Sequence, residues 1–417
     1  MSNIKRETFF LYIVQLSNMA LPLLLVPYLT STLGAEYFGK LSYAQVVNML
    51  AMFFVDFGFN LSAARYIGIN LSNKIRLKKA FVNVQFVKFI IFLCINVAGL
   101  AFVPLIHQQP IDNKILIVGI LCSISSILTP AWFFQGIGKN SVLAVTNFFT
   151  RIASLILTIC FVKTQGDIML AIYFQLLSPA IAGLISILFL WKMHIIEMNF
   201  RFFSLKFCRE MFGESIHNFL ASFLTLGFTY FNPLLIKYFL GDSALGIYSL
   251  ADKLVNILRQ LYSPLVQANF SSMCQFFKNG ELTLARNRAL KVFYFFSLLS
   301  GLAIVTNLIF GEYFIYRFFA AKYSDSEKIS VHNLIYIMIL TQYIVSISMV
   351  LVNLILIPAG LSFYLKRVYT FALVIYFSII YPMANIFTIN GIASSVLIVE
   401  LAIIIMFFIL IKFRKVV

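Results

Sequence analysis

Charged and amide side chains lie inside the long apolar segments of this sequence, where a charge is costly unless it faces protein or water. The first set is Asp56, Asn60 and Arg65, in the stretch DFGFNLSAAR. Asp56 and Asn60 are four residues apart, so one continuous helix would place them on the same face. Such groups either form a structural contact between helices or line a polar pathway through a membrane, and both interpretations stay open.

A second set lies between residues 249 and 267, where polar side chains recur every three or four residues. This spacing predicts one polar face on a helix that is otherwise apolar. Asp252 and Arg259 lie two turns apart on that face and would partly neutralise each other. The residues expected to give a cavity its polar lining are Gln45, Asn48, Asn60, Asn256 and Gln260.

The cations inside or beside apolar segments favour an anionic ligand. A guanidinium group matches phosphate geometry with two parallel hydrogen bonds, so phosphate and pyrophosphate are the expected anions. Lys88 and Arg151 either reach toward the membrane surface or face a cavity. The candidate anion-binding residues are Arg65, Lys88, Arg151, Lys253 and Arg259.

Carboxylates inside the membrane are candidates for coupling transport to a proton or sodium gradient, and the alternative is a neutralised structural acid. The candidates are Asp56, Asp252 and Glu400. The segment GIGKN at 136–140 lacks the residues of a nucleotide-binding loop. The sequence shows no metal-ligand spacing and no catalytic set, so we expect no cofactor and no enzymatic activity.

The composition indicates whether these segments lie in water or in a membrane. The 417 residues are 61% hydrophobic and 11% charged, with a mean hydropathy of +0.94. These values exclude a soluble domain and predict an all-α polytopic membrane protein. The net charge of +17 comes from bases in short loops, which indicates membrane orientation and attraction to anionic lipids rather than binding to nucleic acid.

About twelve membrane spans fit the usual length of about 20 residues. Basic loops alternate with less basic ones, which places both termini in the cytoplasm. The expected spans are 9–31, 41–64, 80–104, 114–135, 142–162, 168–191, 216–240, 246–270, 291–311, 331–357, 368–388 and 390–411.

An internal repeat divides the chain. Residues 33–45 (LGAEYFGKLSYAQ) align with 240–252 (LGDSALGIYSLAD) at a constant offset, each at the joint between two spans. Each copy begins six spans, so the two halves are expected to be parallel repeats related by an axis along the membrane normal. We therefore expect an N-terminal lobe at 1–191, a cytoplasmic linker at 192–215 and a C-terminal lobe at 216–417.

Three motifs together resemble one family: LG with YFG at 33–39, DFGFNL with Arg65, and PAWFFQG at 130–136 followed by Arg151. The chain is similar to the O-antigen flippases, the Wzx-type polysaccharide transporters. The motifs cover mainly the first five spans, and length and span count extend the likeness over the whole chain.

The resemblance implies two six-helix lobes that form a V around a central cavity, in a bacterial inner membrane protein. It implies alternating access that moves an O-antigen or related oligosaccharide on undecaprenyl pyrophosphate to the periplasmic leaflet. Its expected partners are this substrate, membrane lipids, a polysaccharide polymerase and a chain-length regulator. One alternative is a multidrug extruder of the same superfamily, but the bases inside the membrane segments argue against it. A second is an integral-membrane polymerase or glycosyltransferase, but the short loops argue against it. A third is a channel.

Overall fold

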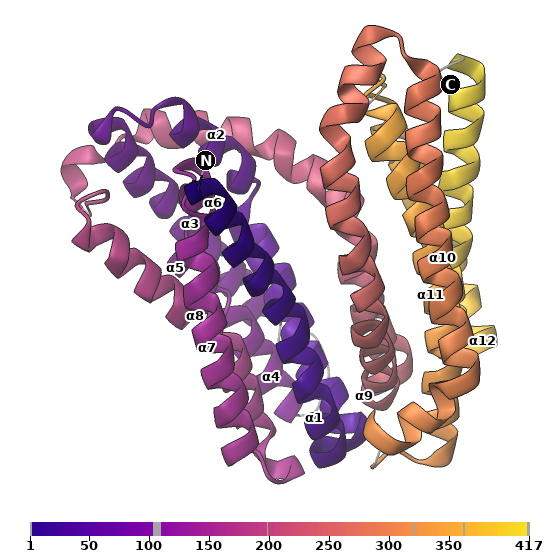
Figure 1. Ribbon diagram of the computed structural model, residues 1–417. Helices are drawn as coiled ribbons and strands as arrows, with labels where there is room; N and C mark the ends of the chain where they lie inside the picture. The colour runs from indigo at the N-terminus through magenta and orange to yellow at the C-terminus, as the bar shows by residue number, and fades with distance from the viewer. Residues whose placement is uncertain (1, 103–109, 198, 320–321, 362, 415–417) are drawn as a thin grey trace. The chain divides into compact units, whose positions relative to one another are not determined.

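The computed structural model describes residues 2–102, 110–197, 199–319, 322–361 and 363–414, and throughout these ranges the regular structure is helical (Figure 1). Contacts divide the chain into two compact units. The first unit comprises residues 1–33 and 40–223, and the second comprises residues 34–39 and 224–417. Each unit is described by itself.

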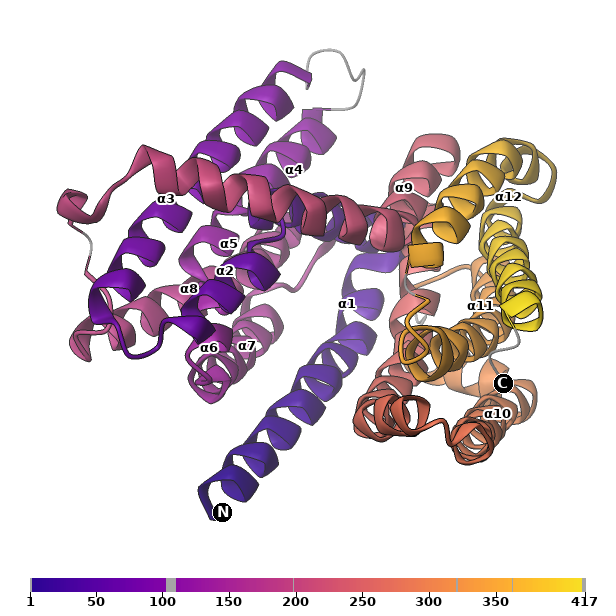
Figure 2. The same ribbon diagram turned by 90° about the horizontal axis from the view of Figure 1, so that it is seen from above.

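The first unit is a bundle of helices crossed by the start of α9 (Figure 2). Within it, α7 packs along α8, and α2 packs against α6. Its elements are α1 (Ser2–Asp56), α2 (Phe59–Ile69), α3 (Lys74–Phe102), α4 (Pro110–Leu121), α5 (Ile124–Leu128), α6 (Ala131–Gly136), α7 (Asn140–Phe161), η2 (Gln165–Asp167), α8 (Ile168–Lys192), η3 (Phe200–Phe202) and the start of α9 (Leu205–Asn279).

The second unit contains the rest of α9 and the C-terminal helices, with α11 packed against both α10 and α12. Two short π-helical segments follow α10 and α11, and such segments frequently occur at functional sites. The elements are α10 (Leu282–Phe314), η4 (Ile315–Phe319), α11 (Asp325–Val350), η5 (Leu351–Leu356) and α12 (Phe363–Arg414).

The helices of the described residues can be compared with the twelve predicted spans. Nine helices there are long and apolar enough to cross a membrane. Three of these are interrupted by one residue with non-helical backbone, at Gly34, Gly241 and Thr388. Dividing the three helices at these residues gives the number of spans that the sequence predicts.

The two repeat copies share their backbone break. Gly34 has φ 71° and ψ 180°, and Gly241 has φ 85° and ψ −171°. Glycine adopts positive φ without the steric penalty that a Cβ atom imposes. The shared dihedral angles show that the two copies of the repeat have the same local structure, as the alignment predicts.

The DFG segment does not form the continuous helix over 41–64 that its hydropathy predicts. Phe57 (φ 41°) and Gly58 (φ 77°) separate α1 from α2. A Cβ atom on Gly58 would lie 2.6 Å from the carbonyl oxygen of Ser215, so this glycine lets α9 approach. The expectation that Asp56 and Asn60 share one continuous helix face is therefore wrong.

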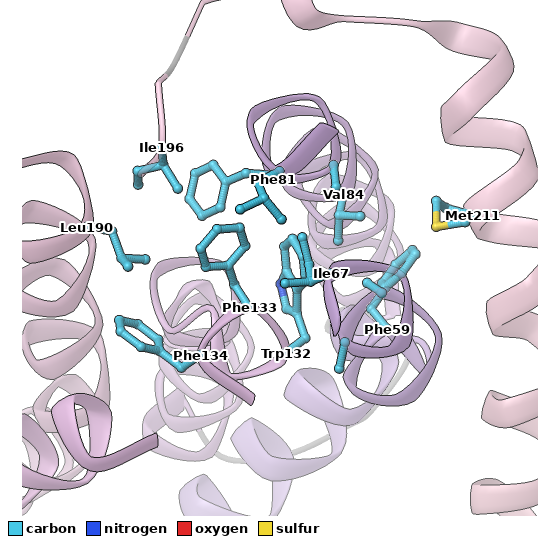
Figure 3. Close-up of a cluster of buried hydrophobic side chains, with 14 of the residues drawn as sticks. Phe59, Ile67, Phe81, Val84, Trp132, Phe133, Phe134, Leu190, Ile196 and Met211 are labelled. Atoms are coloured by element: carbon cyan, nitrogen blue, oxygen red, sulfur yellow. The ribbon is translucent and has the colours of Figure 1, made fainter. Parts of the chain in front are cut away.

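The PAWFFQG motif contributes to a hydrophobic core in the first unit. Trp132, Phe133 and Phe134 of the PAWFFQG motif are fully buried there. Figure 3 shows them beside side chains from α2 and α3. This motif therefore stabilises the fold by burying large apolar surfaces rather than by contacting a ligand.

Candidate functional site

The second unit contains a cavity of about 310 Å³ between α9, α11, η5 and α12. Polar side chains and apolar ones share its wall. Among the described residues, the polar lining consists of Asn232, Tyr248, Asp252, Arg259, Thr341, Gln342, Ser348, Asn353, Tyr369 and Glu400. A wall of this kind can offer charge and hydrogen bonds to a polar ligand inside an apolar protein.

Three charged side chains line this cavity. Asp252 and Arg259 come from the same face of α9, and Glu400 comes from α12. The guanidinium of Arg259 donates from Nε to Oε1 of Gln342 at 3.2 Å. This contact uses one of the five donors of the guanidinium, so the group is oriented while further donors can meet an anion.

The amide of Asn232 is also held in place. The hydroxyl of Tyr376, a fully buried residue of α12, donates to Oδ1 of Asn232. The π-helical turn η5 brings Val352 and Asn353 to the same cavity. The cavity is therefore partly preorganised by contacts between α9, α11 and α12.

The first unit uses its intramembrane charges differently. Nζ of Lys88 lies 2.8 Å from Oδ1 of Asp56 and donates to the carbonyl oxygen of Ser126 at 2.7 Å. Oγ of Ser126 donates to the same Asp56 oxygen at 2.6 Å. Lys88 is fully buried. These three residues connect α1, α3 and α5 through a closed network.

The remaining candidates of the first unit have other surroundings. Nε2 of Gln45 donates to Oε1 of Gln175 on α8 at 2.5 Å. Asn48 is buried and contacts the sulfur of Met52. Arg65 is exposed on α2, and Asn60 and Arg151 are half-buried.

The other α9 candidates do not join the cavity of the second unit. Nζ of Lys253 lies 4.9 Å from the ring centre of Phe38, which is also part of this unit. Asn256 and Gln260 are half-buried and are not among the described residues that line the cavity. Asp252, Arg259 and Glu400 are thus the sequence candidates that line this cavity together, while Lys88 and Asp56 meet in the network of the first unit.

Sequence reasoning missed several lining residues. Tyr248 is one turn before Asp252 on α9, so the helical period could have indicated it. Gln342 and Ser348 lie in a span that carries several hydroxyl and amide side chains. Tyr369 and Asn353 show no comparable spacing, because their position depends on how the helices pack.

Helices long and apolar enough to cross a membrane, with a cavity lined by charged and amide side chains in the second unit, are typical of a multi-pass membrane transport protein. The sequence profile of the family described as "Polysaccharide biosynthesis protein" matches residues 4–276. The chain belongs to this family.

A relative and two solved structures extend the comparison. The chain is 26% identical over 401 residues to a protein of Shigella dysenteriae named "Putative O-antigen transporter", covering 96% of this chain and 98% of the relative. It resembles an inward-facing multidrug resistance MATE family transporter of the MOP superfamily, with a TM-score of 0.75, 13% identity and coverage of 96% and 97%.

The chain also resembles the lipid II flippase MurJ in an inward closed conformation, with a TM-score of 0.73, 12% identity and coverage of 97% of this chain and 87% of that one. At these identities the two structures establish the fold. The all-α, two-lobe transporter architecture predicted from the sequence is confirmed. These proteins are transporters rather than enzymes, as the sequence predicts for this chain.

Proposed function

We propose that the protein moves undecaprenyl-pyrophosphate-linked O-antigen units, or units of a related surface polysaccharide, from the cytoplasmic to the periplasmic leaflet by alternating access. Membership in a polysaccharide biosynthesis family and the O-antigen transporter name of its full-length relative support this function. A polysaccharide polymerase and a chain-length regulator are the proposed downstream partners, because the moved units must then be joined.

The observation that carries the proposal is the position of Arg259. It lies in a cavity whose other polar groups are carboxylates, amides and hydroxyls, and Gln342 orients its guanidinium. A guanidinium can hold a phosphate through two parallel hydrogen bonds. Amides and hydroxyls suit the hydroxyl groups of sugars, which both donate and accept.

The test compares two arginines of the second unit that make the same kind of contact. Arg259 donates to an amide oxygen in the cavity, and Arg288 donates from Nε to Oδ1 of Asn269 at 2.6 Å outside the cavity lining. In proteoliposomes with a labelled lipid-linked oligosaccharide, Arg259→Ala should lower the flipping rate by at least about tenfold, because a hydrogen bond to a charged group contributes about 1.5–3 kcal/mol.

Arg288→Ala is the matched control and should flip at close to the normal rate. Equal loss in both variants, at equal amounts of folded protein, would contradict the assignment of the cavity. In cells lacking the native gene, the Arg259→Ala variant should leave lipid-linked glycan on the cytoplasmic leaflet.

A multidrug extruder is the second candidate, and one observation favours it. Asp252 and Glu400 give the cavity two carboxylates against one guanidinium, a balance that suits a cationic compound. Saturable export of a lipophilic cation that Glu400→Gln abolishes, with no movement of lipid-linked glycan, would establish this alternative.

The proposed location is the bacterial inner membrane with both termini in the cytoplasm. The support is the distribution of basic residues among the loops. Reporter fusions at Asn3 and Val417 should be active in the cytoplasm, and activity in the periplasm would reverse the topology and the direction of transport proposed here.

A further inference from the structure

A second cavity lies in the first unit, where η3 meets the start of α3. It has a volume of about 520 Å³ and, in the part of the chain that the structure describes, is lined by Ile75, Lys79, Arg201, Phe202, Phe203 and Ser204. This lining contains two cations and no carboxylate. The cavity forms between the first turns of α3 and the segment that precedes α9, so the proposed flipping function does not account for it.

A buried asparagine fixes the shape of this cavity. Nδ2 of Asn83 on α3 donates to the carbonyl oxygens of Lys79 at 2.6 Å and Phe202 at 2.8 Å. Its Oδ1 accepts from the backbone N–H of Ser204 at 2.7 Å. Asn83 is fully buried, so these bonds hold the segment at 202–204 against α3 and give the cavity a defined wall.

The neighbouring charges leave the cavity cationic. Lys78, next to Lys79, forms an ion pair with Glu197 at 2.6 Å. The hydrogen bond from Lys78 holds the pKa of the Glu197 carboxyl below its usual range, and Arg201 adds a smaller electrostatic effect. Nζ of Lys79 lies 5.3 Å from the ring centre of Phe207, and among the described residues no carboxylate lines the cavity with it.

One lining residue, Ile75, and the two residues that flank the lining segment 201–204 in sequence are large, apolar and exposed. The exposed fractions are 67% for Ile75, 85% for Phe200 and 71% for Leu205. Phe200 and Leu205 lie between the membrane-spanning segments that end at Lys192 and begin at Phe231. Exposed apolar and aromatic side chains beside cations are typical of a surface placed at the boundary between headgroups and acyl chains.

We propose that this cavity binds the headgroup phosphate of an anionic phospholipid. Lys79 and Arg201 hold the phosphate, and Ile75, Phe200 and Leu205 contact the acyl chains. The cations select a negative headgroup, and the apolar rim selects a lipid over a soluble anion. The phosphate of a lipid-linked glycan has the same chemistry, so the experiment must separate the two sources.

The experiment measures lipid retention by native mass spectrometry of the full-length protein in detergent, titrated with phosphatidylglycerol or phosphatidylcholine. Phosphatidylglycerol should bind at least tenfold more tightly than phosphatidylcholine. The double variant Lys79→Ala/Arg201→Ala should lose most of this preference, since each cation near a membrane surface contributes about fivefold in affinity.

The matched control is Lys74→Ala/Lys206→Ala, which removes the same charge from two exposed positions outside the cavity lining. It should retain the preference. An equal loss in both double variants would reduce the effect to general surface charge and overturn the proposed site.

Undecaprenyl pyrophosphate is the competing probe. If it displaced phosphatidylglycerol at stoichiometric amounts from the wild-type protein, and the cavity variant abolished this displacement, the site would belong to the transported substrate and the phospholipid proposal would be wrong. Phospholipid binding is measured without transport, so the two proposals can fail separately.

Discussion

Two bases inside apolar segments, Lys88 in the first unit and Arg259 in the second, have different surroundings. In the first unit, Lys88 and Asp56 neutralise each other and also bond to Ser126, with the lysine fully buried. In the second unit, Arg259 is oriented by a neutral amide in a cavity that also contains Asp252 and Glu400. A base inside an apolar segment therefore has a structural role in one case and a candidate binding role in the other.

The internal repeat makes this contrast sharper. Gln45 occupies the repeat position of Asp252, and its amide is bonded to Gln175. At the equivalent position of the second unit, a carboxylate lines a cavity. The repeat preserves the backbone while the polar group at one position has diverged, so a role cannot be transferred from one copy to the other.

The largest effect is expected from breaking the closed network. Lys88→Ala leaves the Asp56 carboxylate without its cation, and removal of one partner of a buried ion pair costs about 3–5 kcal/mol. The Asp56 side chain is 28% exposed, so a loss of unfolding free energy near the lower end is expected. Thermal unfolding in detergent would show it as a lower Tm.

The control for this prediction is Lys78→Ala. Its ion pair with Glu197 has nearly the same length, 2.6 Å, but both side chains are more exposed than those of Lys88 and Asp56, so Tm should change little because solvent screens the pair. If Lys88→Ala kept a normal Tm and abolished flipping, Lys88 would instead contact the substrate, as the sequence hypothesis has it.

The next effect concerns energy coupling. Protonation of a cavity carboxylate removes a charge and would shift the balance between conformations, which gives a gradient a way to act. Asp252→Asn and Glu400→Gln should therefore make flipping independent of an imposed pH or sodium gradient, measured in proteoliposomes.

Asp56→Asn is the comparison variant, and its flipping should still respond to the gradient although its Tm falls. Loss of the response in Asp56→Asn alone would move the coupling role to the first unit. If flipping depended on the gradient unchanged in all three variants, the coupling role of these carboxylates would be contradicted. Facilitated flipping, driven by removal of the product, would then be the remaining explanation.

The smallest effect is expected at Gln45. Gln45→Ala removes one hydrogen bond to Gln175, so unfolding should become easier by about 1 kcal/mol. Transport per folded molecule should stay normal, because the amide pair lies in the first unit. A large transport defect with a normal Tm would show that Gln45 functions like its repeat counterpart Asp252.

Much of the fold could be predicted because hydropathy and turn chemistry are local properties. The breaks at Gly34 and Gly241 follow from the repeat, and the break at Thr388 lies at the predicted boundary between spans 368–388 and 390–411. The break at Phe57 and Gly58 was missed, because it depends on the approach of a distant segment at Ser215.

The part of the candidate site that lies on a single helix could be predicted from the spacing of polar residues. Asp252 and Arg259 lie on one face of α9, and both line the cavity. The contacts of Lys88 with Asp56 and of Arg259 with Gln342 join different helices. Spacing along a single helix carries no information about such pairs, so the sequence could not separate the neutralised base from the candidate ligand.

The close approaches at Gly39 and Gly246 bear on how the internal repeat arose. A Cβ atom on Gly39 would lie 1.9 Å from the carbonyl oxygen of Asp242, and one on Gly246 would lie 2.0 Å from that of Ala35. In the repeat alignment, Gly39 is equivalent to Gly246, and Ala35 is equivalent to Asp242. The contact is therefore self-complementary, as at the two-fold interface of a homodimer. It is the contact expected if a gene for a half-length chain that once paired with itself was duplicated and fused.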